Sequence, residues 1–133
     1  MATDSLIYAL IQALHNLGAA LLLGAPVFWL ALAPRAERAR PLLGLLAALW
    51  VLQGFTGAGF GIASWLLYGR LPDLHPTALG ALGIKIACVV AGLILSVFPL
   101  SRTAVAPDRA AWLGLAASAA LALCAAAVLR WSS

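Results

Sequence analysis

The chain has 133 residues, of which 65% are hydrophobic and 9% are charged, and its mean hydropathy is +1.06. A soluble domain of this length could not hide so much apolar surface from water, which excludes a soluble globular protein. The net charge of +4 would suggest nucleic acid in a soluble protein, but here the basic residues are better explained as topology signals, so no nucleic-acid partner is expected.

Four apolar stretches are long enough to cross a bilayer, which takes about 20 residues. They cover residues 6–33, 42–68, 78–100 and 110–129. We therefore predict an all-α fold, an integral membrane four-helix bundle, with residues 1–133 forming a single transmembrane domain. The first stretch lacks the basic start of a secretory signal and is too long for one, so we take it as the first helix.

The basic residues of the connectors predict the orientation of the bundle. The connectors after the first and third helices hold five arginines: Arg35, Arg38, Arg40, Arg102 and Arg109. The opposite side holds only Arg70 and Arg130. By the positive-inside rule both termini lie outside, in a multi-pass protein of the bacterial inner membrane.

A weak internal repeat accompanies this topology. His15 and Lys85 are 70 positions apart, and the Val27-Phe28 pair is separated by the same interval from Val97-Phe98. Both helical pairs also turn around an arginine-bearing connector. The pattern favours two parallel helical hairpins.

Two spans carry a basic side chain, His15 in the first and Lys85 in the third. At a rise of 1.5 Å per residue they lie about 14 Å and about 11 Å below the outer ends of their spans. A polar side chain at such depth is costly and normally faces the bundle interior. We therefore predict that the two side chains share a site in the outer half of the membrane.

The surroundings of His15 favour a lined site. An imidazole suits haem iron or copper, the alternative being a structural hydrogen bond to another helix. Gln12, three residues earlier, could orient the ring, and Tyr8 lies on the route to the outer surface. Gly57, in the glycine-rich second helix, could make room for a macrocycle, the alternative being close helix packing. Gln53 and Thr56 are read as helix contacts in preference to site lining.

Lys85 is the candidate for chemistry. Neutral, it could relay protons or coordinate a metal; charged, it could pair with a haem propionate. No predicted span contains an acid, because the four acids are Asp4, Glu37, Asp73 and Asp108. An anionic partner for Lys85 must then be Asp73, another subunit or a ligand, and we expect a ligand. His75, beside Asp73, could capture a metal at the entrance, the alternative being a solvated loop histidine.

The segment LHNLGAALLLGA (residues 14–25) resembles the first helix of the copper-resistance protein D (CopD) family, and GIKIA (83–87) resembles its lysine-bearing helix. HemJ-like four-helix membrane proteins are similar, with one histidine in the first span and one lysine in the third. The resemblance covers roughly residues 6–102 and implies His15 as ligand of a metal or of haem b, with Lys85 as its partner. Two features depart from the pattern: no Glu-Arg-Arg stretch follows the first connector, and Leu23 stands where a tryptophan is usual.

Three functions remain open, and an enzymatic role is left undecided. The first is a redox-linked membrane protein with a haem-b or metal site built on His15 and Lys85. The second is copper uptake or relay from the periplasmic side, past His75 to His15. The third is a non-catalytic packing subunit of a larger membrane complex. The expected partners are the lipid bilayer, haem or a copper ion, and another membrane or periplasmic protein or a second copy of the chain.

Overall fold

The computed structural model describes residues 2–32, 36–69, 75–102 and 107–131, and it contains four long helices in that part of the chain. They are α1 (Ala2–Leu32), α2 (Ala39–Tyr68), α3 (Pro76–Ser101) and α4 (Arg109–Trp131), with a short 3-10 turn η1 (Ala36–Arg38) before α2. Each helix is long and apolar enough to cross a membrane, and the chain is a multi-pass membrane protein. The predicted all-α four-helix fold is confirmed.

The helices begin one to four residues earlier than the sequence predicted. α2 includes Pro41 because the N–H groups of a first helical turn have no acceptor within the helix, so a missing one costs nothing there. Pro76 opens α3 for the same reason. Gly69 closes α2 with a left-handed φ of 67°, and its N–H donates to the Trp65 carbonyl at 2.9 Å.

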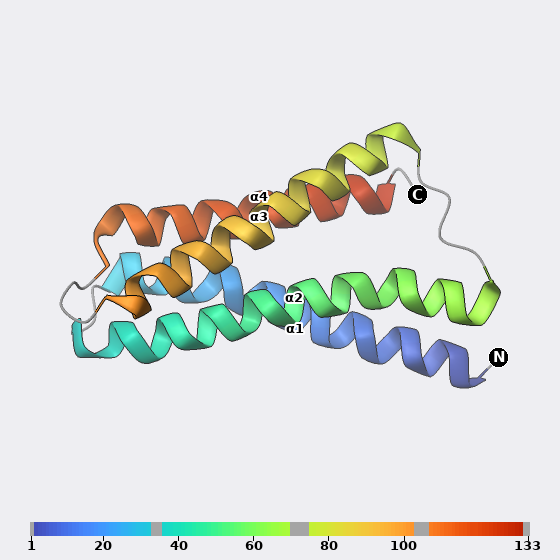
Figure 1. The fold of residues 1–133 in the computed structure, drawn as a ribbon, viewed down its shortest axis with the longest axis horizontal. Coiled ribbons are helices and arrows are strands. Elements are labelled where there is room, and N and C mark those ends of the chain that lie inside the picture. Colours follow the sequence, from blue (N-terminus) through green and yellow to red (C-terminus); the bar gives the residue numbers. More distant parts are fainter. Residues whose placement is uncertain (1, 33–35, 70–74, 103–106, 132–133) are drawn as a thin grey trace.

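The helices pack in the cyclic order α1, α2, α3, α4 (Figure 1). The diagonal pairs, α1 with α3 and α2 with α4, make no close backbone contact. Two hairpins, α1–α2 and α3–α4, therefore lie against each other, each made of two antiparallel helices. The beginning of α1 and the end of α4 lie at the same end of the bundle. The orientation of the bundle relative to the membrane stays a prediction. Two of the arginines on which that prediction rests, Arg35 and Arg70, lie outside the described residues.

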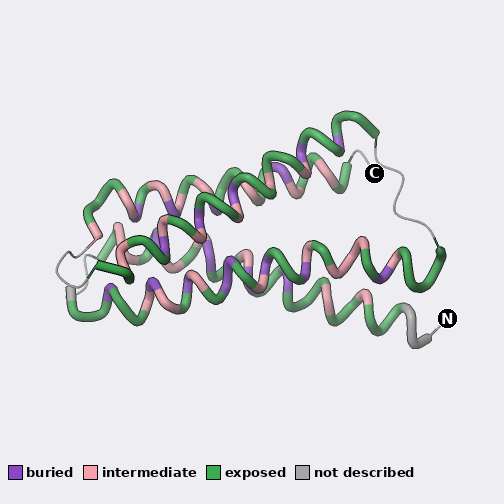
Figure 2. The backbone as a smooth tube through the Cα atoms, viewed as in Figure 1, coloured by how far each residue is buried: buried purple, intermediate pink, exposed green. Residues whose placement is uncertain are grey.

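The apolar core fills the bundle from its middle toward the end where α2 and α4 begin (Figure 2). Its largest members include Leu43, Leu46, Trp50, Trp112 and Leu115. Trp29 of α1 stacks on Trp112 of α4, with ring centroids 4.6 Å apart. Outward-facing residues such as Phe55, 74% exposed, present apolar surface to lipid.

Trp50 and Gly92 set the distance between α2 and α3. The indole of Trp50 is packed so tightly on Gly92 that a Cβ atom added at this glycine would overlap the ring. Only a residue without a side chain lets the helices come this close. Trp50 is 1% exposed, so the contact lies in the centre of the core.

Arg40 fastens the first hairpin to the second. Its Nη1 donates to the Arg102 carbonyl at 3.1 Å and its Nη2 to the Leu100 carbonyl at 2.9 Å. The last carbonyls of a helix have no partner within it, and the guanidinium of Arg40 supplies one at the end of α3. The guanidinium of Arg102 in turn lies 4.3 Å from the centre of the Phe98 ring.

The two hairpins bury their residues in the same pattern. Each position from 16 to 30 in α1 is as buried, half-buried or exposed as the position 70 residues further on in α3. α2 and α4 correspond at an interval of 69, which pairs buried residues of the two helices: Leu43 with Trp112, Leu46 with Leu115, Trp50 with Ala119 and Thr56 with Ala125. This agreement supports the predicted arrangement of two parallel hairpins.

We expect Gly92→Ala to destabilise the bundle by about 1–3 kcal/mol, because the Trp50 ring must move out of a close-packed core. Gly80→Ala, on the same helix, is the matched control, since a Cβ at Gly80 meets no atom within 4 Å. Unfolding of each variant in mixed detergent micelles measures its stability. Equal stability of the two variants would show that this contact does not set the helix spacing.

Candidate functional site

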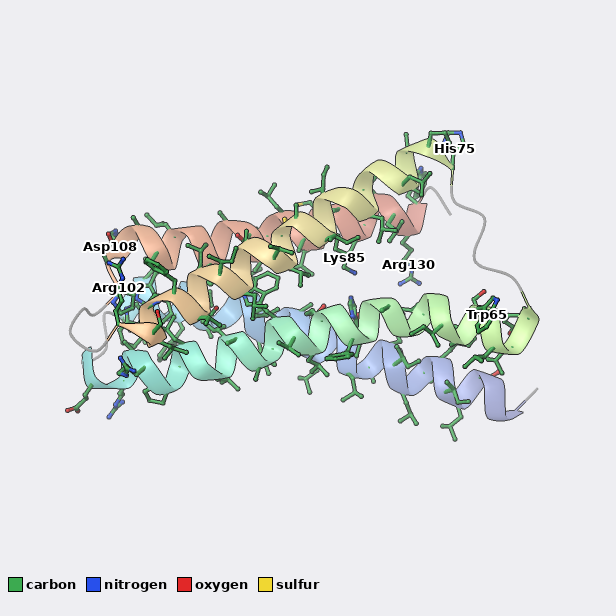
Figure 3. All side chains as sticks on the ribbon, viewed as in Figure 1. Trp65, His75, Lys85, Arg102, Asp108 and Arg130 are labelled. Carbon is green, nitrogen blue, oxygen red and sulfur yellow. The ribbon has the colours of Figure 1, made fainter. Side chains whose placement is uncertain are left out.

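The structure brings together the two basic side chains of the spans. The Nζ of Lys85 lies 2.8 Å from the Nε2 of His15, within hydrogen-bonding distance. Because α1 and α3 are diagonal neighbours, this bond joins the two hairpins across the bundle. Lys85 points from α3 toward the α1–α2 hairpin (Figure 3). His15 is only 7% exposed and Lys85 is half-buried, so the pair is largely enclosed by protein.

Thr56 of α2 fixes the other side of the His15 ring. Its Oγ1 lies 2.7 Å from His15 Nδ1 and donates to the Leu52 carbonyl, also at 2.7 Å. A hydroxyl has one hydrogen, and here the Leu52 carbonyl takes it. The Nδ1 of His15 must therefore carry the ring hydrogen and donate to Thr56. In the neutral ring, Nε2 then has a lone pair, which accepts a hydrogen from Lys85.

Gln53 holds the backbone of the same histidine. Its Nε2 donates to the His15 carbonyl at 2.7 Å, and Gln53 is 5% exposed. The amide reaches this carbonyl over Gly18, where an added Cβ would lie 2.6 Å from Gln53 Nε2. α2 thus forms hydrogen bonds with both the ring and the main-chain carbonyl of His15. Such doubled support orients a functional side chain before it meets a ligand.

Aromatic and glycine residues of α2 complete the ring's surroundings. The edge of the Phe60 ring meets the His15 ring at a centroid distance of 5.8 Å and an angle of 78°. Tyr8 stacks on Phe60 at 6.4 Å, so this predicted site residue reaches His15 through Phe60. A Cβ added at Gly57 would lie 3.9 Å from His15 Cε1, so Gly57 faces the imidazole directly.

Gln12 does not orient the imidazole, and that expectation was wrong. Gln12 is exposed, and its Nε2 donates to Asn16 Oδ1 at 2.9 Å. In lipid a side-chain amide must find its partner within the protein, and Asn16, one turn further on, is the nearest one. Thr56 and Gln53, for which the sequence favoured helix contacts over site lining, support His15 instead.

His75 lies apart from the pair. It precedes the first turn of α3, is exposed, and its Nδ1 lies 2.9 Å from Thr77 Oγ1. Lys85 lies ten positions further along the chain, which is about 15 Å along the helix axis. Figure 3 shows it at the far end of α3. Asp73, its predicted neighbour, lies outside the described residues. Within the described ranges, no three His, Cys, Asp or Glu side chains gather as metal ligands.

A cavity of about 60 Å³ adjoins the His15–Lys85 pair. The two basic residues line it together with Gln53, and α4 contributes Ala122 and Ala126 to its wall. One water molecule needs about 10–15 Å³ of such space. The cavity is therefore large enough for a few water molecules or for one small ligand in contact with both nitrogen groups.

We expect Thr56→Val to cost about 1–3 kcal/mol of stability, because it leaves the buried N–H at Nδ1 without an acceptor. The hydrogen should also redistribute between the two ring nitrogens. The ¹⁵N chemical shifts of ring-labelled histidine report this directly, with His75, the chain's other histidine, as internal reference. Thr56→Ser keeps the hydroxyl and should keep the wild-type shifts. Unchanged shifts in Thr56→Val would remove Thr56 as the orienting group.

Comparison with known proteins gives no family: no protein-family model, curated protein or solved structure matches the chain. The resemblance to CopD and HemJ-like proteins therefore stays a prediction, and the function has to be argued from the chemistry of the site itself.

Proposed function

We propose that the protein is a redox-linked protein of the bacterial inner membrane that exchanges protons at the His15–Lys85 pair. With both termini outside, as the connector charges predict, the pair lies in the outer half of the bilayer. The single observation that carries the proposal is the 2.8 Å hydrogen bond between Lys85 Nζ and His15 Nε2. The link to a redox reaction comes from the resemblance described above.

The hydrogen-bond pattern supports proton transfer between the two groups. An ammonium at Lys85 can pass a proton to the lone pair of Nε2, which leaves a neutral amine and an imidazolium. The imidazolium keeps its second N–H on Thr56, so the ring need not turn during the transfer. The adjoining cavity gives the pair a place at which a ligand or water molecule could take up the proton.

The apolar core lies on one side of the pair. Toward the other face of the membrane it fills the bundle with residues such as Leu43, Leu46 and Trp112. Among the described residues, this core holds no titratable side chain that could carry a proton onward, and the nearby buried hydroxyl of Ser96 already donates to the Gly92 carbonyl. We therefore propose that the pair serves a reaction in the outer half of the membrane, with Lys85 as the acid–base group and His15 as its partner, and that it does not conduct protons across.

Haem b does not fit the site as the helices pack here. Cofactor pockets usually enclose about 300–1,000 Å³, whereas this cavity encloses about 60 Å³. Lys85 also occupies the lone pair of Nε2, the atom that would bind iron. No step of the proposal runs through haem, and haem b remains a prediction of the resemblance alone.

Copper relay and a packing role stay as alternatives. A copper route from His75 to His15 would need ligands from a partner protein, because about 15 Å of helix separates His75 from Lys85. The packing role would use the exposed apolar faces of the helices, such as the one that carries Phe55. Neither alternative requires the hydrogen bond between His15 and Lys85, and this is how experiment separates them from the proposal.

We expect His15 and Lys85 to titrate as one unit. In wild-type protein in lipid nanodiscs, the ¹⁵N shift of His15 Nε2 should follow pH in two steps, because interacting groups share their protons. Lys85→Met should reduce the profile to one step, and His75→Asn should leave it unchanged. Identical His15 profiles in wild type and Lys85→Met would refute the proposal.

A visible spectrum of the purified protein tests the cofactor separately. A Soret band that is present in wild type and His75→Asn and lost in His15→Asn would establish haem on His15. That result would overturn the proposed proton exchange at the His15–Lys85 pair. Copper that co-purifies with the protein and is lost in His15→Asn would favour the relay. We expect neither signal to depend on His15.

A further inference from the structure

The correspondence between the two hairpins locates the cavity. Lys85 in α3 stands where His15 stands in α1, 70 residues earlier. At the interval of 69 that relates α2 to α4, Ala122 corresponds to Gln53 and Ala125 to Thr56. The first hairpin therefore supports its basic residue with two polar side chains, whereas the second places alanines at both positions.

The cavity lies where side chains of the second hairpin are smaller than their counterparts in the first. Gln53 fills the space beside His15 and donates to its backbone carbonyl. Beside Lys85 the equivalent residue, Ala122, ends at its Cβ atom, and Ala122 lines the cavity with Ala119, the counterpart of Trp50. The space of about 60 Å³ is thus what remains when a glutamine and a tryptophan of one hairpin are alanines in the other.

The wall of this space is mostly apolar, and Lys85 and Asn16 bring hydrogen-bond donors to it. Of the described residues that line it, Lys85 is the one lysine or arginine, and none is an acid. Asn16 also lines the cavity; its Oδ1 accepts from Gln12, which leaves its Nδ2 to donate. The indole of Trp50 forms another part of the wall, and its N–H edge lies against Gly92.

The charge balance of the membrane segments favours an anion beside a protonated Lys85. None of the four acids of the chain lies within the spans Ser5–Leu32, Ala39–Tyr68, Pro76–Ser101 and Arg109–Trp131. An ammonium at this depth is stabilised by an opposite charge, since neither lipid nor an apolar core solvates it. An ammonium has three hydrogens, and His15 accepts only one of them.

We propose that the cavity between Lys85 and Ala122 binds one carboxylate, held by the Lys85 ammonium and the Asn16 amide. This inference rests on the proposed function, because it assigns a ligand to the same proton-bearing lysine. The volume suits a carboxylate group with one or two carbon atoms. Asn16 and Leu123 line the cavity and are exposed, so it reaches the lipid-facing surface between α1 and α4. The carboxylate can therefore belong to a small water-soluble acid or to the head of an acidic amphiphile that enters from the bilayer.

Thermal unfolding of the purified protein tests this in a buffer free of other carboxylates. We expect acetate and decanoate, titrated separately below micelle-forming concentrations, to raise the melting temperature in a saturable way. Acetamide, which matches acetate in size and lacks its charge, should not raise it. Stabilisation by both acids would identify the carboxylate alone as the ligand, and stabilisation by decanoate alone would identify an amphiphile from the membrane. If neither acid exceeds acetamide, the inference is wrong.

Variants of α4 separate the cavity from the pair. Ala122→Gln rebuilds in the second hairpin the residue that fills the first, and Ala122→Leu fills the space with an apolar side chain. Both should abolish the carboxylate effect, as should Lys85→Met. Ala127→Leu, on the exposed face of α4, is the matched control and should bind like wild type. Carboxylate binding that survives in both Ala122 variants would overturn the proposed position.

The ¹⁵N shifts of His15 tell the failure of this inference from the failure of the proposed function. In Ala122→Leu they should keep their wild-type, two-step pH profile while carboxylate binding is lost. If the two-step profile exists and no carboxylate binds to wild type, the proton pair stands and the ligand assignment falls. If every variant that loses carboxylate binding also loses the two-step profile, the pair and not the cavity is responsible for binding. The assignment of the carboxylate to the cavity is then wrong as well.

Discussion

The hydrogen bond between His15 and Lys85 is the interaction on which the half of the bundle nearer the chain termini depends. A polar side chain inside a bilayer has no water molecule with which to form a hydrogen bond, so its partner must come from the protein or from a ligand. Here each basic residue finds the other across the bundle diagonal, at a place where the backbones of α1 and α3 do not approach. The bond is thus a polar contact that joins the two hairpins beyond the end of their apolar core.

The fold could be predicted from the sequence because the bilayer leaves few choices. Its thickness fixes the length of a span, and four apolar stretches of that length leave only short connectors. The meeting of His15 and Lys85 could be predicted from depth alone, since both residues lie at similar distances from the first residues of two parallel predicted spans. Helix ends were less certain, because prolines such as Pro41 are tolerated within a first turn.

The supporting residues could not be predicted from depth, because they depend on how each helix is rotated about its axis. Gln12 is near His15 in sequence but points to lipid, whereas Thr56, 41 residues away, holds the ring. The spacing of Gln53 and Thr56, three residues apart on one face of α2, was the signal that could have found them. The cavity required more: it becomes visible only when the second hairpin is compared with the first, position by position.

Arg40 makes the two ends of the bundle unlike. Its guanidinium ties the start of α2 to the last carbonyls of α3. The largest fully buried side chains, among them Trp50, Trp112, Leu43, Leu46 and Leu115, lie in the half of the bundle nearer to this end. The end where the chain begins and finishes lies opposite (Figure 1). Most of the apolar burial that holds the two hairpins together is therefore concentrated far from the termini.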